Sequence, residues 1–76
     1  MLVTIFTPKY EIKSGIGIRI WRECDRDSVF VFWRNIDSIQ AVNTDVIIRQ
    51  TGMVYQLVFA DDTKAETAYQ EILAAF

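Results

Sequence analysis

The alternation of hydrophobic and polar side chains is clearest near the end of the chain. Met53, Tyr55, Leu57 and Phe59 are apolar at every second position, which is the period of a strand that buries one face. Beyond this segment apolar residues recur at three- and four-residue steps, at Ala65, Ala68, Tyr69, Ile72, Leu73 and Phe76. That spacing is typical of an amphipathic helix. The pattern therefore predicts a strand that leads directly into a C-terminal helix.

The start of this helix carries a capping signal. Thr63 is followed three residues later by Glu66, the spacing of a capping box, so we expect Thr63 to be the N-cap. A helix of about 13 residues is marginal when isolated in water. We therefore expect its apolar stripe to pack across a sheet, through Ala65, Tyr69, Ile72, Leu73 and Phe76.

Further strands are predicted earlier in the chain, over residues 2–7, 16–24, 29–33 and 46–50. In the second of these, the isoleucines at even positions are expected to face the core, with Arg19 and Trp21 on the opposite face. Gly15 and Gly17 indicate a bulge or a close backbone approach there. The run 29–33 is apolar at five consecutive positions, which predicts a central strand covered on both faces.

Two segments give weaker patterns. Residues 9–14 are mostly polar and are interpreted as a connection that is able to pair as an edge strand, and residues 35–42 as a turn or short irregular segment held by Ile36 and Ile39. The fold class predicted is α+β: a single small domain over residues 1–76, with a curved antiparallel sheet of four or five strands and one C-terminal helix packed on one face.

Composition adds a hint about function. Of 76 residues, 51% are hydrophobic and 13% aromatic, and a chain this short buries proportionately little surface. Two interpretations follow: either part of this apolar surface is covered by another chain, or it overfills a small core. The net charge of −2 argues against general coating of nucleic acids and against a basic membrane anchor.

Catalytic chemistry has few candidate residues. The chain has no histidine and one cysteine, Cys24, so histidine triads and thiolate zinc sites are excluded. Asp25 with Asp27 is assigned to a hairpin tip and Asp61 with Asp62 to the helix start, and an enzyme built on them needs two convergent acids in a pocket. Cys24 is expected to be a buried thiol. We expect no enzyme activity, no metal and no cofactor.

The cellular setting is also predicted from the sequence. A lone cysteine fits a reducing compartment, no apolar run approaches 18 residues, and the first residues do not resemble a signal peptide. The prediction is a cytoplasmic protein without a membrane span.

Arginine and tryptophan side chains give the candidate binding site. They lie in or beside predicted strands, and we expect them to contact a partner: Arg19, Trp21, Trp33, Arg34 and Arg49. Such a surface suits a protein partner or a second copy of the chain. The alternative is a single-stranded nucleic acid stacked on the same rings. A third interpretation places the tryptophans half in the core, with the arginines extended over them.

The second half of the chain resembles a known family. The run from Trp33 to Ile39 contains an Ile-x-x-Ile element, and it is followed by a strand, Gly52, a second strand and a terminal helix. Over residues 29–76 this arrangement is similar to bacterial pleckstrin-homology-like domains. The resemblance implies a C-terminal helix that plugs one end of a bent sheet, usually of seven strands. This chain departs from the family pattern in being short for seven strands, so the resemblance carries over neither a closed barrel nor any binding residue.

The small size, acidity and aromatic content also resemble those of accessory proteins of phages and mobile elements, which often act by blocking a host partner. The predicted function is a non-enzymatic interaction module that associates with itself and binds a protein partner through an aromatic and arginine-rich sheet face or a strand edge.

Overall fold

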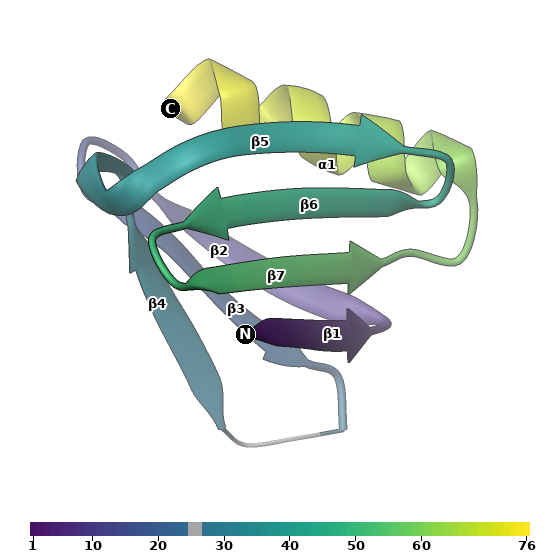
Figure 1. Cartoon of the computed structure of the whole chain (residues 1–76). Coiled ribbons are helices and arrows are strands. Elements are labelled where there is room, and N and C mark those ends of the chain that lie inside the picture. Colours follow the sequence, from purple (N-terminus) through teal and green to yellow (C-terminus); the bar gives the residue numbers. More distant parts are fainter. Residues whose placement is uncertain (25–26) are drawn as a thin grey trace.

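The computed structural model describes residues 1–24 and 27–76, which form a two-layered β structure with one α-helix (Figure 1). The elements in chain order are β1 (Leu2–Phe6), β2 (Pro8–Lys13), β3 (Gly17–Arg22), β4 (Ser28–Phe32), the short 3₁₀ helix η1 (Trp33–Asn35), β5 (Ile36–Val42), β6 (Asp45–Gln50), β7 (Met53–Val58) and α1 (Asp62–Ala75). The predicted α+β class with a C-terminal helix packed on a sheet is confirmed.

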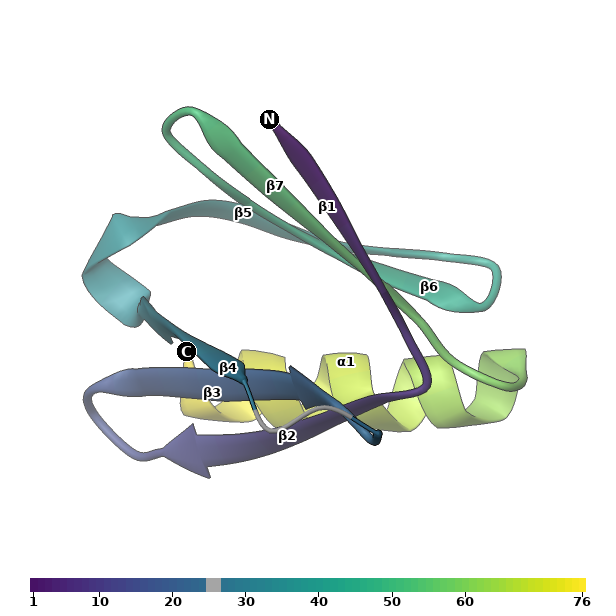
Figure 2. The ribbon, with the colours of Figure 1, turned by 90° about the horizontal axis from the view of Figure 1, so that it is seen from below.

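The strands form two sheets. One has four strands in the order β1-β7-β6-β5, and the other has three in the order β2-β3-β4. β1 pairs with β7 in parallel, whereas the other pairs are antiparallel. Between β1 and β2 lies only Thr7, whose φ of 45° turns the chain sharply from one sheet into the other. Figure 2 shows the two layers edge-on, with this corner joining them.

Helix α1 covers one flank of the two layers. It contacts β5 and β6 of the four-stranded sheet, and in both ribbon views it also runs near β2 of the other sheet (Figures 1 and 2). The Tyr10 hydroxyl on β2 donates a hydrogen bond of 2.7 Å to Glu71 Oε1 on the helix. The buried helix residues are Ala65, Ala68 and Ile72; the two alanines let the helix approach the strands closely, and Ile72 fills the core.

The core lies between the two sheets and the helix. Ile18 and Ile20 come from the three-stranded sheet, Ile48 and Leu57 from the four-stranded sheet, and Ile72 from α1, and each is fully buried. Burial of each of these side chains contributes about 1.5–3 kcal/mol to folding. The prediction that the even-numbered isoleucines of residues 16–24 face the core is correct for Ile18 and Ile20 and wrong for Ile16, which precedes β3 and is 54% exposed.

Two strand assignments differ from the prediction. The described residues contain seven strands instead of four or five, because residues 35–42 contain β5 rather than an irregular segment. Residues 9–14 take the alternative of an edge strand, as part of β2 (Pro8–Lys13). A register shift between Ile36 and Ser38 disrupts the alternation of β5, which is why its pattern looked irregular. β4 is an edge strand, not a central one, and the side chains of Phe30 and Phe32 are 37% and 40% exposed.

The helix also starts and packs differently in detail. Its N-cap is Asp61, not Thr63, because Asp61 Oδ1 accepts a 2.8 Å hydrogen bond from the Lys64 backbone N–H. Leu73 and Phe76, predicted to pack on the sheet, are 40% and 54% exposed. The helix therefore buries a stripe of smaller side chains than its sequence pattern suggested.

Cys24 is exposed, so the expectation of a buried thiol is wrong: β3 ends at Arg22, before the cysteine can enter the core. Asp25, assigned to a hairpin tip, lies outside the described residues. No helix within residues 1–24 and 27–76 is long and apolar enough to cross a membrane.

Candidate functional site

The outer face of the three-stranded sheet holds most of the unusual surface side chains. Because side chains alternate along each strand, and because directly paired residues share a face, the register places three rows side by side. We call this surface the aromatic face. Its rows are Lys9–Trp21–Ser28, Glu11–Arg19–Phe30 and Lys13–Gly17–Phe32.

Gly17 makes room for the phenyl rings of this face. A Cβ atom at position 17 would lie 2.2 Å from the Val31 carbonyl oxygen and 2.9 Å from Cε2 of Phe30. Both distances are shorter than atoms tolerate, so only glycine lets β4 and the Phe30 ring come this close. The predicted close backbone approach at Gly17 is confirmed.

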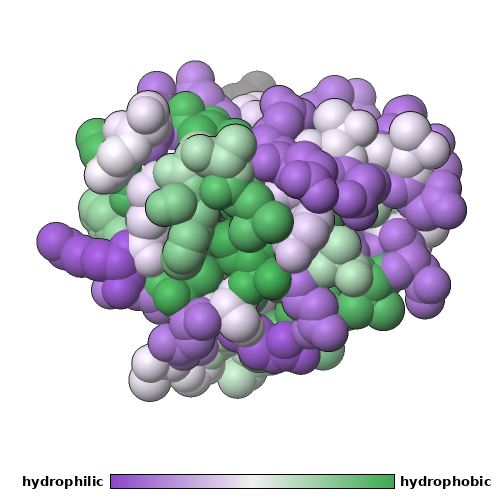
Figure 3. All heavy atoms as spheres, turned by 90° about the horizontal axis from the view of Figure 1, so that it is seen from above, coloured by the Kyte–Doolittle hydropathy of each residue, from purple (hydrophilic) through white to green (hydrophobic). Residues whose placement is uncertain are grey.

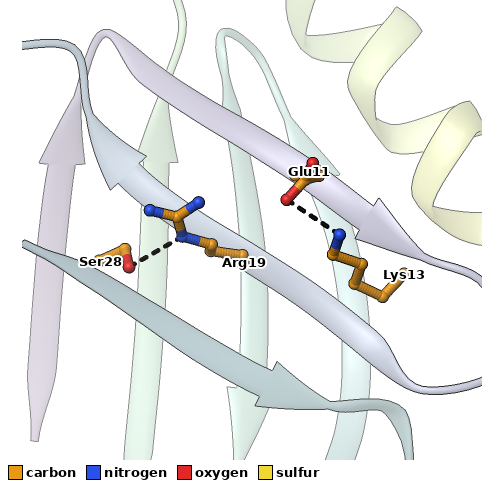
Figure 4. A network of polar contacts seen from close by, with 4 residues as sticks. All are labelled: Glu11, Lys13, Arg19 and Ser28. Atoms are coloured by element: carbon orange, nitrogen blue, oxygen red, sulfur yellow. Dashed lines mark hydrogen bonds and ion pairs between the residues drawn. The ribbon is translucent and has the colours of Figure 1, made fainter.

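Arg19 organises the centre of the aromatic face. Its guanidinium carbon lies 4.9 Å from the centroid of the Trp21 ring, within the range of a cation–π interaction. Its Nε donates a 3.0 Å hydrogen bond to Ser28 Oγ on β4 (Figure 4). One side chain thus stacks on an indole of its own strand and ties β3 to β4.

Phe30 and Phe32 form the apolar part of the aromatic face. Their ring centroids are 5.0 Å apart with an interplanar angle of 74°, an edge-to-face contact. Arg34, which follows β4 in η1, places its guanidinium carbon 5.1 Å from the Phe32 ring centroid. Two partly exposed phenyl rings are therefore flanked by two guanidinium groups.

The aromatic face is cationic although the chain is acidic. Together with Arg34 it carries four bases (Lys9, Lys13, Arg19 and Arg34) and one acid (Glu11), a net +3. Lys13 Nζ lies 3.3 Å from Glu11 Oε1, and both side chains are about half exposed (Figure 4). Such a surface ion pair contributes about 0–1 kcal/mol to stability, so its main effect is on the local charge.

The structure brings together only part of the predicted site. Arg19 and Trp21 share the aromatic face, and Arg34 lies at its end. Trp33 is half-buried, its ring lies 5.8 Å from that of Phe76, and its buried Nε1 has no partner among the described residues. Arg49 lies on β6 of the other sheet, where its Nη1 donates a 2.8 Å hydrogen bond to Gln40 Oε1.

Phe30 and Phe32 are the surface residues that the predicted site omitted. The sequence did contain a signal for them, because they alternate with Val29 and Val31 inside one apolar run. That alternation leaves two phenyl rings on whichever face is not packed on the core. Only the position of β4 at an edge of the sheet shows that this face is open.

The apolar surface continues beyond the aromatic face. Ile16, Phe32, Trp33 and Phe76, together with Arg34, line a hollow of about 500 Å³ near the end of α1. Ile16 and Phe76 are each 54% exposed. Figure 3, which looks down on the molecule from above the view of Figure 1, shows hydrophobic atoms gathered toward one side among hydrophilic ones.

Two further hollows bear on catalytic chemistry. A cleft of about 390 Å³ opens between the sheets, lined mainly by apolar side chains, with Asp27 as its one acid among the described residues. Another, of about 520 Å³, contains Asp62 from the first turn of α1 and Glu66 from the second, near the helix N-terminus, where carboxylates are favoured by the helix dipole. Within the described part of the chain, no three metal-binding side chains of the His, Cys, Asp or Glu type are grouped.

Comparison with known proteins gives no relative. No protein family, no curated protein and no solved structure matches this chain.

Proposed function

We propose that this chain is a non-enzymatic interaction module that binds a protein partner through the aromatic face and associates with itself at the neighbouring strand edge. The observation that carries the proposal is the exposure of Phe30 and Phe32, at 37% and 40%, beside the guanidinium groups of Arg19 and Arg34. Aromatic and arginine side chains are the groups that dominate the energy of protein interfaces.

The charge of the aromatic face indicates what kind of partner it takes. A net +3 surface around two phenyl rings suits a protein segment that presents carboxylates around an apolar side chain. The phenyl rings supply the buried area, and the lysine and arginine charges speed association and select against basic partners.

The resemblance to bacterial pleckstrin-homology-like domains is part of the same proposal. Seven strands followed by one helix, among the described residues, is the number that this resemblance implies, and it supports the proposal. A cytoplasmic protein that blocks a host partner, as accessory proteins of phages and mobile elements do, would use such a surface.

Single-stranded nucleic acid is the second candidate partner, favoured by the four cations of this surface. Base stacking needs accessible ring faces. The guanidinium groups of Arg19 and Arg34 already lie over the rings of Trp21 and Phe32. The protein partner is therefore the better supported of the two.

The test of the protein-binding proposal uses two matched double variants. Arg19→Glu with Phe32→Ser changes the aromatic face, and Arg49→Glu with Phe6→Ser makes the same changes on the outer face of the other sheet. A partner captured by the unmodified chain in cells is purified, and its binding to each variant is measured by calorimetry. We expect at least about tenfold weaker binding for the first variant only. Equal binding by both variants would exclude the aromatic face.

The nucleic-acid alternative is tested with a fluorescent single-stranded oligonucleotide at low and moderate salt. If this alternative is right, anisotropy reports binding that weakens with salt and is lost when Arg19 and Trp21 are both replaced by alanine. Binding that is unchanged by the two substitutions excludes these residues as a nucleic-acid site.

A further inference from the structure

The outer edge of β4 has free backbone groups. The Trp33 N–H donates a 3.0 Å hydrogen bond to the Ile16 carbonyl, and these two residues flank the Gly17–Phe32 pair, so this pair is of the non-hydrogen-bonded kind. Bonded and non-bonded pairs alternate in an antiparallel ladder. The N–H and C=O groups of Val29 and Val31 therefore point to β3. Those of Ser28 and Phe30, and the N–H of Phe32, point away from it, toward the open side within the described part of the chain, whereas the Phe32 carbonyl caps η1.

Nothing in the sequence of β4 protects this edge. Its residues, Ser-Val-Phe-Val-Phe, include no charge and no proline. Natural edge strands usually carry lysine, proline or a bulge, or are covered, because a bare edge pairs with other strands. β2 carries Pro8 and three charges, and β5 has a register irregularity near its start. β1, at the other edge of the four-stranded sheet, is likewise uncharged, so β4 is one of two apolar edges among the described residues. A long apolar edge without such devices is expected to have a partner.

We infer that a second copy of this chain pairs its β4 with this edge, antiparallel and around a two-fold axis at Phe30. This inference rests on the proposed function, since it names a second copy as one partner at the same surface. Phe30 then lies opposite Phe30 of the second copy, and Ser28 opposite Phe32 of the second copy. The residues facing the open side form the bonded pairs, which gives about four new backbone hydrogen bonds: two between the Phe30 residues and one in each Ser28–Phe32 pair, where the Phe32 carbonyl is already engaged by η1.

The side chains suit this arrangement. Directly opposed residues point to the same face, so the two Phe30 rings meet and the two aromatic faces become one continuous surface. Asp27 precedes β4 and Arg34 follows it. An antiparallel pair brings Asp27 of each copy to the same end as Arg34 of the other, so opposite charges lie near each other at both ends of the pair, although the two side chains point to opposite faces of the sheet. A parallel pair would place like charges together instead.

The area available predicts a weak dimer. A phenyl side chain buries about 150–250 Å² in full, and Phe30 and Phe32 are each less than half exposed. Two five-residue strands and four such rings bury less than the roughly 1,600 Å² of a standard stable interface. We expect a dissociation constant on the order of 10–100 μM.

Sedimentation from about 5 μM to 1 mM tests the dimer. Phe30→Glu places a carboxylate opposite Arg19 within one copy, which preserves the monomer, and opposite a second carboxylate across the two-fold axis. We expect its dissociation constant to rise at least about tenfold. Leu73→Glu, which introduces the same charge at a comparably exposed apolar residue of α1, should leave dimerisation unchanged. A wild-type chain that stays monomeric at 1 mM, or equal effects of both variants, would overturn the inference.

Charge reversal tests the antiparallel register. Asp27→Arg and Arg34→Asp should each raise the dissociation constant roughly fivefold, because each places like charges at both ends of the pair. The double variant should restore the wild-type value, since each copy then presents both reversed charges. If the double variant dimerises more weakly than either single variant, because the two effects add, the result contradicts this register.

Amide hydrogen exchange locates the contact. The amides of Phe30 and Phe32 should exchange fast at low protein concentration and slow down at high concentration, whereas those of Val29 and Val31 should be protected throughout. Concentration-independent exchange at Phe30 contradicts the inference. If the chain stays monomeric while partner binding still depends on Arg19 and Phe32, this inference and the proposed self-association fail, and the protein-binding proposal stands. If the chain dimerises at β4 without any partner that depends on the aromatic face, the protein-binding proposal fails alone.

Discussion

The two edges of the three-stranded sheet are built in opposite ways. β2 begins with Pro8 and alternates charged side chains outward, at Lys9, Glu11 and Lys13, and the Tyr10 hydroxyl is bonded to α1. β4 shares the same central strand, β3, but has an uncharged edge and two exposed phenyl rings. Charge and proline keep an edge from pairing, whereas an apolar edge invites it. One sheet thus has a protected edge and an edge suited to binding.

The side chains of the aromatic face also change from the protected edge to the open edge. Across the rows the residues change from lysine and glutamate on β2, through arginine and tryptophan on β3, to serine and phenylalanine on β4. A partner docking on this surface would meet its apolar part at the strand whose backbone is also free. The difference between the edges therefore places side-chain and main-chain binding groups together.

The largest expected effect comes from a substitution that moves β4 away from β3. Gly17→Ala puts a Cβ 2.2 Å from the Val31 carbonyl oxygen, so β4 has to move away from β3, and we expect unfolding free energy to fall by about 3 kcal/mol. Urea unfolding followed by circular dichroism measures it. Gly15→Ala is the control: it meets no atom within 4 Å but has a φ of +77°, so its cost should be about 1 kcal/mol. If both variants lose the same unfolding free energy, the close approach of β4 to Gly17 makes no specific contribution to stability.

A smaller effect is expected from removing the hydrogen bond between Tyr10 on β2 and Glu71 on α1. Burial, the hydrogen bond to Glu71 and the charge of Glu71 together raise the pKa of Tyr10 from 10.0 to about 12. The raised pKa means that the folded state favours the protonated phenol. Its contribution is complete below pH 10 and is lost as pH rises through about 12. Tyr10→Phe should therefore lower stability by about 1 kcal/mol at neutral pH, and the difference should vanish toward pH 12.

Urea unfolding of the two proteins from pH 8 to 12 tests this pH dependence. Tyr69→Phe is the matched control, since the Tyr69 hydroxyl lies on the half-buried side of α1 with no hydrogen-bond partner among the described residues. A stability difference between wild type and Tyr10→Phe that persists unchanged at the highest pH would show that the bond to Glu71 is not its source.

The smallest effect is expected from removing a charge from the protected edge. Lys13→Met breaks the half-exposed pair with Glu11, so unfolding free energy should change by less than about 0.5 kcal/mol. The rate of aggregation on warming should nevertheless rise, roughly twofold, because the edge loses a protecting charge. Light scattering measures it, with Lys64→Met on the exposed side of α1 as control. The same aggregation rate in both variants would argue that the charges of β2 do not protect its edge.

Much of the fold could be predicted from residue patterns. The alternation around Tyr55 and Leu57 predicted β7, and the change of period at Ala65 predicted α1, because both signals reflect one buried face. β5 escaped because its register shift near Asp37 interrupts the alternation. The N-cap was misplaced because Asp61 and Thr63 are both favourable capping residues, and only the bond to Lys64 distinguishes them.

The candidate site could be predicted less well. Arg19 and Trp21 were correctly assigned to one face of β3, since that assignment needs only the two-residue period of a strand. Trp33 and Arg49 were grouped with them because they too lie in or near strands, although the structure places Trp33 against Phe76 and Arg49 on the other sheet. The exposure of Phe30 and Phe32 depends on which strands neighbour β4.

By itself, the sequence determined where five of the strands and the helix lie, and which side chains of each point the same way, since backbone geometry ties these to local spacing. Only the tertiary structure decided that β1 pairs in parallel with β7, that the strands divide into two sheets, and that β4 lies at an edge. These are contacts between residues far apart in the chain, and a strand's own pattern reports which face is apolar but not which strand lies beside it.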